Sequence, residues 1–312
     1  MQIVRDYQFV NEEDRGASAA IGNFDGVHLG HQHVIDLARA EAEKLGAPLG
    51  VVTFEPHPRE YFAPKAPPFR LMNAETRAHR LEKLGVGKLY ELNFNATLSA
   101  LAPEEFARDV LAEGLSLKHV VVGADFRFGK GRAGTAEDLV RFGREMGFGV
   151  TIATLLKGEL GAVSSTAIRQ ALSDGRPRDA ARMLGHWHRI DGEVIRGDQR
   201  GRGLGFPTAN MSITGLHPPR FGVYAVEVEV LTGPHAGTYG GAASMGVRPM
   251  FGENLPNLES YIFDFQGDIY GEHLSVALVE YLRPEETFPS LEALVEQINA
   301  DCARARAILA AL

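Results

Sequence analysis

Two histidines three residues apart follow a short apolar run near the start of the chain. The stretch GNFDGVHLGHQ, residues 22–32, places His28 and His31 after Gly22 and Gly26. Glycines let the backbone approach a ligand closely, and a helix starting here would present free N–H groups and its positive dipole end to an anion. The spacing favours a phosphate clamp. Half of a metal site and an ordinary pair of capping or core histidines are the alternatives.

A second polar segment, VSSTAIRQAL at 163–172, also carries groups that could hold phosphate oxygens. Ser164, Ser165 and Thr166 can cap a helix start and donate hydrogen bonds. Arg169 follows Thr166 by three residues and therefore shares its helical face. An ordinary capped helix is the alternative for this segment.

A basic loop, GADFRFGKGRAG at 123–134, contains Arg127, Lys130 and Arg132. Its glycines match G-x-G-x-x-G, the dinucleotide fingerprint, but the match follows a late strand and no acidic residue closes a second strand at the required distance. We therefore reject a dinucleotide site. A loop that brings basic side chains toward a phosphorylated substrate is the better interpretation, with a solvated basic loop as the alternative.

In the second half, GFPTAN at 205–210 stiffens at Pro207 before two polar residues, Thr208 and Asn210. Residues two apart in an extended segment point to the same side. A hydroxyl and an amide oxygen side by side suit Mg²⁺, whose remaining ligands would be phosphates and water. A turn that uses both side chains for local hydrogen bonds is the alternative.

The segment NLESYIFDF, 257–265, contains one carboxylate in an aromatic stretch. If it forms a strand, Glu259 shares a face with Tyr261, Phe263 and Phe265. Burial penalises the charged form of a carboxylate and makes it a better general base. The spacing leaves two interpretations open, an outward-facing barrel residue and a buried base.

The first half alternates short apolar runs with helical patterns. The expected strands are SAAIGNF, GVVTF, HVVVGADF and GVTIATL, and apolar residues three and four apart predict helices over 30–45, 74–84, 103–114 and 135–146. This alternation predicts an α/β doubly wound parallel sheet. Ligands in such folds bind at the carboxyl ends of the strands, which is where GNFDG falls.

From about residue 187 the pattern becomes β-rich. The segments RIDGEVI, GVYAVEVEVL, LESYIFDF and HLSVALVEYL predict an antiparallel sheet or small barrel. A last helix over 290–309 is expected, capped by Ser290, with an apolar stripe of Leu291, Leu294, Val295, Ile298, Cys302 and Ile308. The domain boundary falls within 173–188, which gives domains of 1–184 and 185–312.

The bulk composition excludes several classes of protein. The 312 residues are 45% hydrophobic and 23% charged with a net charge of −8, which is typical of a soluble globular protein and argues against nucleic-acid and membrane-surface binding. Cys302 is the single cysteine, so intramolecular disulfides and cysteine zinc sites are excluded. The start lacks a signal-peptide pattern, and no apolar run reaches the roughly 18 residues of a membrane span. We expect a cytoplasmic protein.

Together, GNFDGVHLGH and SSTAIR resemble the nucleotidyltransferases with a His-x-Gly-His signature and a distant Ser/Thr–Arg element. VVTFEPHP and GADFRFGKGRAG narrow the resemblance to the adenylyltransferase half of bacterial bifunctional riboflavin kinase/FAD synthetases. The resemblance implies ATP and phosphate binding by Gly22, Phe24, His28, His31, Ser165, Thr166 and Arg169, with the two histidines catalytic. It also implies flavin binding by Asp125, Arg127 and Phe128.

The second half resembles riboflavin kinases, a family with a six-stranded antiparallel β-barrel. GFPTAN, GVYAVEV, GVRPMFG, LESYIFDF and YLRPEETF occur in that family's order. The resemblance implies that Thr208 and Asn210 bind Mg·ATP, that Glu259 deprotonates the 5′-hydroxyl of riboflavin, and that Arg283 binds flavin. Met250 departs from the family, which usually has threonine there, so this chain lacks a side-chain hydroxyl at that position.

The resemblance implies two reactions, phosphorylation of riboflavin to FMN and adenylylation of FMN to FAD with release of pyrophosphate. ATP is the co-substrate of both, ADP is a product of the first, and both need Mg²⁺. Weak self-association is left open. The rivals are a nucleotidyltransferase for another small phosphate, such as a pantetheine or nicotinamide nucleotide, and a flavin-binding sensor without turnover.

Overall fold

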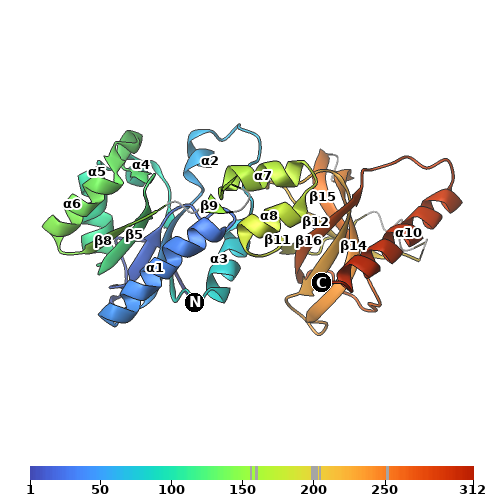
Figure 1. The fold of residues 1–312 in the computed structure, drawn as a ribbon, viewed down its shortest axis with the longest axis horizontal. Helices are drawn as coiled ribbons and strands as arrows, with labels where there is room; N and C mark the ends of the chain where they lie inside the picture. The colour runs from blue at the N-terminus through green and yellow to red at the C-terminus, as the bar shows by residue number, and fades with distance from the viewer. Residues whose placement is uncertain (155–156, 159–160, 198–202, 204, 251–252) are drawn as a thin grey trace. The chain divides into compact units, whose positions relative to one another are not determined.

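The computed structural model describes the chain apart from residues 155–156, 159–160, 198–202, 204 and 251–252 (Figure 1). The described residues form two compact units. The first unit comprises Met1–Pro67 and Arg77–Val163, and the second comprises Pro68–Thr76 and Ser164–Leu312.

The first unit is built on a six-stranded parallel sheet. From one edge to the other its strands are β1 (Gln2–Val4), β4 (Lys88–Asn93), β3 (Leu49–Glu55), β2 (Ser18–Ile21), β5 (His119–Gly123) and β8 (Gly149–Ala153). The strand order reverses between β2 and β5, and a ligand crevice opens at the carboxyl ends of the strands at such a reversal.

Helices cover both faces of this sheet, so the predicted doubly wound fold is confirmed. On one face lies α1 (Leu29–Leu45), where Ser18 Oγ donates to Ala38 O at 2.8 Å. The alternate β2 residues, Ala19 and Ile21, point to the other face and pack in a core with the helices there. The unit also contains α2 (Pro58–Phe62), α3 (Ala74–Lys83, whose first three residues belong to the second unit), α4 (Ala96–Ala100), α5 (Pro103–Glu105), the π-helix Phe106–Gly114 and α6 (Ala136–Met146). Two short 3-10 helices, Glu12–Asp14 and Lys130–Arg132, belong to it as well.

Two strands of this sheet were not predicted. β1 is a three-residue edge strand, too short to give a pattern. β4 reads KLYELN, in which polar residues interrupt the apolar run. Glu91 in this strand is nevertheless 5% exposed, because it is paired with Arg77. A buried ion pair is therefore what concealed the strand.

The second unit contains a six-stranded antiparallel sheet that curls into a barrel, as predicted. In spatial order its strands are β11 (His188–Glu193), β16 (His273–Arg283), β13 (Gly222–Val230), β14 (Gly237–Met250), β15 (Glu253–Ile262) and β12 (Thr208–Ser212). Ile195, just after β11, forms an antiparallel bridge with Asn210 of β12 and so connects the two edges of the sheet. Val226, Met245 and Leu258 are among the buried residues that fill the interior.

The C-terminal helix α10 (Leu291–Leu309) packs on the outside of the barrel, as Figure 1 shows. Ser290 caps it as predicted, since its Oγ accepts from Ala293 N at 3.2 Å. Cys302 is partly buried against the apolar cluster beneath the helix, in agreement with its predicted core position. Leu291, in contrast, is 55% exposed, so the predicted apolar stripe begins one turn later. Two further helices of this unit are α7 (Ser165–Ser173) and α8 (Pro177–Leu184).

Candidate active sites

The turn after β2 leads into α1 through an unusual backbone. Phe24 has a φ of 51°, Gly26 of 89° and Val27 of 42°. Only the glycine adopts such a conformation without strain, and a β-branched residue there is costly. Strain of this kind clusters at functional sites, where the surrounding structure holds it in place.

His28 and His31 lie together at the start of α1. His28 is the N-cap, and its Nδ1 accepts from the backbone N–H of His31 at 3.2 Å. The two rings stack with centroids 3.6 Å apart, and the Phe24 ring lies 5.2 Å from that of His31. A Cβ on Gly30 would lie 3.1 Å from His28 Cε1, so a side chain there would press against the ring.

Burial controls the charge of this pair. Loss of solvation lowers the pKa of His28 to about 4 and holds the pKa of His31 well below its usual range, and a charge on His28 would depress the latter further. Both rings are therefore neutral at pH 7, and each can donate one N–H. His31 Nδ1 is buried and has no hydrogen-bond partner among the described residues. Uncharged donors beside a helix N-terminus can accommodate an anion such as phosphate.

The predicted flavin-binding residues of the first unit lie in different environments. Asp125 and Arg127 are exposed. Phe128 is 6% exposed and packs in the core, with its ring centroid 5.5 Å from that of Phe126. Arg127 and Phe128 form the short strand β6, which pairs with β7 (Gly134–Thr135). This hairpin differs from the strand–turn–helix of a dinucleotide site, which supports our rejection of that motif.

The predicted phosphate-binding segment forms the start of α7 in the second unit. Ser164 is the N-cap, and its Oγ accepts from Ala167 N at 3.2 Å. Arg169 donates to Thr166 Oγ1 at 3.2 Å and to the carbonyl of Phe69 at 3.3 Å. Thr166 and Arg169 thus share a face of the helix. Ser165 is half-buried at the first helical position.

In the barrel, the strand register brings three predicted residues together. Asn210 on β12 lies opposite Glu259 on β15, and Thr208 lies opposite Tyr261. Asn210 Nδ2 donates to Thr208 O at 3.3 Å and lies 3.5 Å from Thr208 Oγ1. The intervening Ala209 belongs to the barrel interior, so the polar side chains occupy the outer face.

The surroundings of Glu259 differ in one respect from those predicted. Glu259 is half-buried on the face that carries Tyr261, and Phe263 packs in the same outer cluster as that tyrosine. Phe265 instead packs against the barrel interior, so its predicted place beside Glu259 is wrong. β15 ends at Ile262 and Asp264 has a φ of 54°, which redirects the chain before Phe265.

Asn257 is a neighbour of this carboxylate that sequence reasoning missed. Its Nδ2 donates to Glu259 Oε1 at 3.3 Å, and its side chain is 2% exposed. Asn257 Oδ1 is buried without a hydrogen-bond partner in the described part of the chain. The signal was present in the sequence, since residues 257 and 259 are two apart in one strand.

A cavity of about 260 Å³ lies beside the Thr208–Asn210 pair. It is lined by Pro207, Thr208 and Asn210 together with Val194, Gly197, Ala209, Ile262 and residues 265–270. A Cβ on Gly197 would lie 2.7 Å from the Asn210 amide, so a side chain there would displace that amide. The mixed lining suits a small molecule with one apolar and one polar end.

Two other predicted positions contribute less to this geometry. Arg283 Nη2 is paired with Asp301 of α10 at 2.8 Å, and its side chain is 15% exposed. The backbone of Met250 pairs with that of Glu253 at the end of β14, but the Met250 side chain lies outside what the structure describes.

Within the described ranges no three His, Cys, Asp or Glu side chains gather as a metal site. A divalent cation would therefore need hydroxyl and amide ligands such as Thr208 and Asn210 and the oxygens of a substrate. Among the same residues, no helix is long and apolar enough to cross a membrane.

Comparison with known proteins matches two families to successive parts of the chain. The FAD synthetase family matches residues 10–167, and the riboflavin kinase family matches residues 184–309. The bifunctional riboflavin kinase/FMN adenylyltransferase of Pseudomonas fluorescens is 42% identical over 311 residues, covering 99% of this chain and 98% of that protein. The protein of the same name from Escherichia coli (strain K12) is 38% identical over 308 residues, covering 98% and 97%.

The chain belongs to the bifunctional riboflavin kinase/FMN adenylyltransferase family. A solved structure from Streptococcus pneumoniae, titled a macrolide-efflux protein, superposes with a TM-score of 0.81 at 32% identity. It covers 96% of both chains, so that protein and this family member share both units of the fold.

Proposed function

We propose which residues carry the two reactions of this bifunctional riboflavin kinase and FMN adenylyltransferase. The enzyme uses ATP to convert riboflavin to FMN and then FMN to FAD. One observation supports the assignment above all. Each unit carries its own polar constellation, the stacked histidines on α1 and the Thr208–Asn210–Glu259 group on β12 and β15.

In adenylyl transfer, His28 and His31 bind the phosphates of ATP while the FMN phosphate attacks the α-phosphorus and pyrophosphate leaves. Such a reaction depends on positioning and charge stabilisation, so the protein needs no nucleophile of its own. The buried Nδ1 of His31, which has no hydrogen-bond partner among the residues that the structure describes, supports this role. We assign phosphate contacts also to Gly22, Phe24, Ser165, Thr166 and Arg169, and flavin contacts to Asp125, Arg127 and Phe128.

In the kinase reaction, Glu259 accepts the proton of the riboflavin 5′-hydroxyl while the hydroxyl oxygen attacks the γ-phosphorus of ATP and ADP leaves. Asn257 orients the carboxylate through its 3.3 Å hydrogen bond. The cavity beside Thr208 and Asn210 accommodates part of the nucleotide, and Arg283 contributes to flavin binding.

We propose that Thr208 and Asn210 hold Mg²⁺ together with the phosphates of ATP. The donor set fits, because both side chains offer hard oxygen ligands on one face and Glu259 lies directly opposite Asn210. The orientation of the Asn210 amide, whose nitrogen faces Thr208, would reverse to present its oxygen. Bound Mg²⁺ would neutralise phosphate charge.

We place the functional boundary at 184/185, with adenylyl transfer in 1–184 and the kinase in 185–312. The limits of the two family matches support this division. The composition supports a cytoplasmic location, and weak self-association is compatible with both reactions.

Incubation with riboflavin, ATP and Mg²⁺, followed by separation of the flavins, tests the proposal. FMN and FAD should both appear, and omission of Mg²⁺ should stop the reaction. Riboflavin that binds but stays unchanged would instead indicate a sensor. Absence of any flavin interaction would indicate a transferase for another small phosphate.

A further inference from the structure

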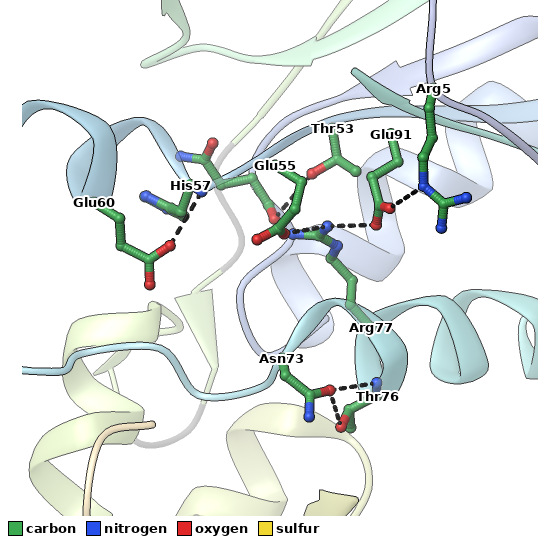
Figure 2. A network of polar contacts seen from close by, with 10 residues as sticks. Arg5, Thr53, Glu55, His57, Glu60, Asn73, Thr76, Arg77 and Glu91 are labelled. Carbon is green, nitrogen blue, oxygen red and sulfur yellow. Dashed lines mark hydrogen bonds and ion pairs between the residues drawn. The ribbon is translucent and has the colours of Figure 1, made fainter. Parts of the chain in front are cut away.

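A buried arginine bridges two carboxylates at the end of the first unit's sheet. Figure 2 shows Arg77 of α3 reaching Glu55 and Glu91 on neighbouring strands. Its Nη2 donates to Glu55 Oε2 at 3.0 Å and to Glu91 Oε2 at 2.9 Å. The Arg77 side chain is 1% exposed and that of Glu91 is 5% exposed. The reactions described above do not use this group.

Stabilisation of the fold does not by itself explain why this buried network of ion pairs is present. Removing charges from water is costly, and apolar residues of similar volume often stabilise a fold at least as well. Arg77 Nε is also buried without a hydrogen-bond partner in the described part of the unit, which adds a further cost. The location of the network offers a better explanation.

Glu55 is the part of the bridge that reaches the ligand-binding edge. It is the last residue of β3, and its side chain is 30% exposed. Thr53, two residues earlier on the same face, donates to Asn23 O at 3.3 Å. That hydrogen bond ties β3 to the turn that leads to the histidine pair. The Glu55 carboxylate therefore lies at the carboxyl edge of the sheet, where ligands of such folds bind.

We propose that Glu55 accepts hydrogen bonds from the hydroxyl groups of a substrate sugar and that Arg77 is its positioning residue. A carboxylate at a strand end recognises ribose hydroxyls in the same way in dinucleotide-binding sheets. Arg77 offsets the charge of Glu55, so the carboxylate can lie near a polyphosphate with less repulsion. The ribityl chain of FMN and the ribose of ATP both carry suitable hydroxyls. This inference rests on the proposal that the first unit performs adenylyl transfer.

Steady-state kinetics of FAD formation by the full chain test the inference. E55Q should raise the KM of one substrate by about 10–100-fold, the range for a lost hydrogen bond to a charged group, and should change kcat less. R77M removes the charge but keeps much of the volume, so it should raise the same KM. The double variant E55Q/R77M should be no worse than the stronger single variant, because Arg77 acts through Glu55. Riboflavin phosphorylation should stay at the parent rate throughout.

R5M is the matched control. Arg5 also pairs with Glu91, at 3.3 Å, but its side chain is 70% exposed and lies on the far side of that carboxylate from Arg77 (Figure 2). R5M should keep the parent KM for both substrates.

Replacing ATP by 2′-deoxy- or 3′-deoxy-ATP, or FMN by a flavin phosphate with a deoxygenated side chain, identifies the sugar that Glu55 contacts. The E55Q effect should disappear for the substrate that lacks the bound hydroxyl.

An unchanged KM for both substrates in folded E55Q would overturn the sugar contact. A lower melting temperature of R77M with unchanged KM would make Arg77 merely structural and overturn its positioning role.

If R77M does not fold, E55Q with the deoxy substrates still decides the sugar contact, and R77K decides the positioning role. R77K keeps the charge but carries it on a flexible stem instead of a rigid guanidinium plane, so it should raise the same KM. FAD formation by H28A at the parent rate would show that the proposed function of the first unit is wrong. A large loss of FAD formation in H28A, together with an unchanged KM in E55Q, would show that only the inference about Glu55 is wrong.

Discussion

The two candidate sites use the backbone in opposite ways. His28 and His31 stand at a helix N-terminus that follows a turn with three residues of positive φ. Thr208, Asn210 and Glu259 stand on two regular neighbouring strands, where the register places Asn210 opposite Glu259. The first site depends on a strained turn, and the second depends on a continuous hydrogen-bonded ladder.

This difference suits the chemistry proposed for each site. A helix N-terminus supplies donors and positive potential to phosphates, which adenylyl transfer requires. A general base must lie within hydrogen-bond reach of one hydroxyl, and side chains on strands are positioned more accurately than those on loops. Changes in one site should therefore leave the other reaction intact.

The largest effect is expected for E259Q. Glutamine keeps the shape of the side chain but cannot accept the proton, so riboflavin phosphorylation should fall by about 10²–10⁴-fold. Riboflavin binding should survive, and FAD formation from added FMN should continue at the parent rate. Initial rates with each flavin measure both activities. E286Q, a change of an exposed carboxylate in the same unit, is the control, and parent-rate phosphorylation by E259Q would refute the base assignment.

A slightly smaller effect is expected at the other site. H28A or H31A should lower FAD formation by on the order of 10²–10³-fold, the usual cost of one preorganised donor to a transition state. FMN formation should be almost untouched. H33A, two residues further along α1, serves as the control and should keep both rates. Equal loss of both reactions in H28A would mean that the histidine pair is structural.

T208V removes a hydroxyl and should change the Mg²⁺ requirement of riboflavin phosphorylation. The Mg²⁺ concentration needed for half-maximal riboflavin phosphorylation should rise on the order of tenfold, comparable with the loss of a supporting contact at a metal site. Titration of Mg²⁺ at saturating ATP measures it. T214V, which changes an exposed threonine in the same unit, should keep the parent requirement. An unaltered requirement in T208V would exclude the hydroxyl as a ligand.

The last prediction concerns a pH dependence of stability in the first unit. The pKa of His28 is about 4 in the fold and near 6.5 in the unfolded chain, so the unfolded state binds more protons between these values. Stability should therefore fall as pH drops below 6.5, by about 2 kcal/mol at pH 5 for this one residue. Urea unfolding of the parent and H28N at pH 7 and pH 5 measures the difference. The same pH dependence in both proteins would contradict burial of a neutral His28.

Much of the architecture could be predicted from periodicity. Apolar alternation identified β11, β13, β15 and β16, and helical spacing identified α1, because each of these elements buries one regular face. The barrel strands β12 and β14 were not predicted. β4 escaped because Glu91 interrupts its apolar run, and its partner Arg77 is fourteen positions away on another element. The displacement of Phe265 also escaped, because a single positive φ at Asp264 leaves no periodic signal.

The residues of the candidate sites could also be predicted only in part. The motifs identified His28, His31 and Glu259 directly, and the pairing of Asn210 with Glu259 required only the strand register. The bridge from Arg77 to Glu55 could not be foreseen, because sheet topology rather than sequence spacing brings these residues together.

One assay of two variants tests the separation of the two sites most directly. H28A and E259Q are each incubated with riboflavin, ATP and Mg²⁺, and the flavins are separated over time. H28A should accumulate FMN with little FAD, whereas E259Q should leave riboflavin unconverted yet make FAD when FMN is added. Loss of both products in both variants would contradict the account, since it would mean that the two constellations do not serve separate reactions.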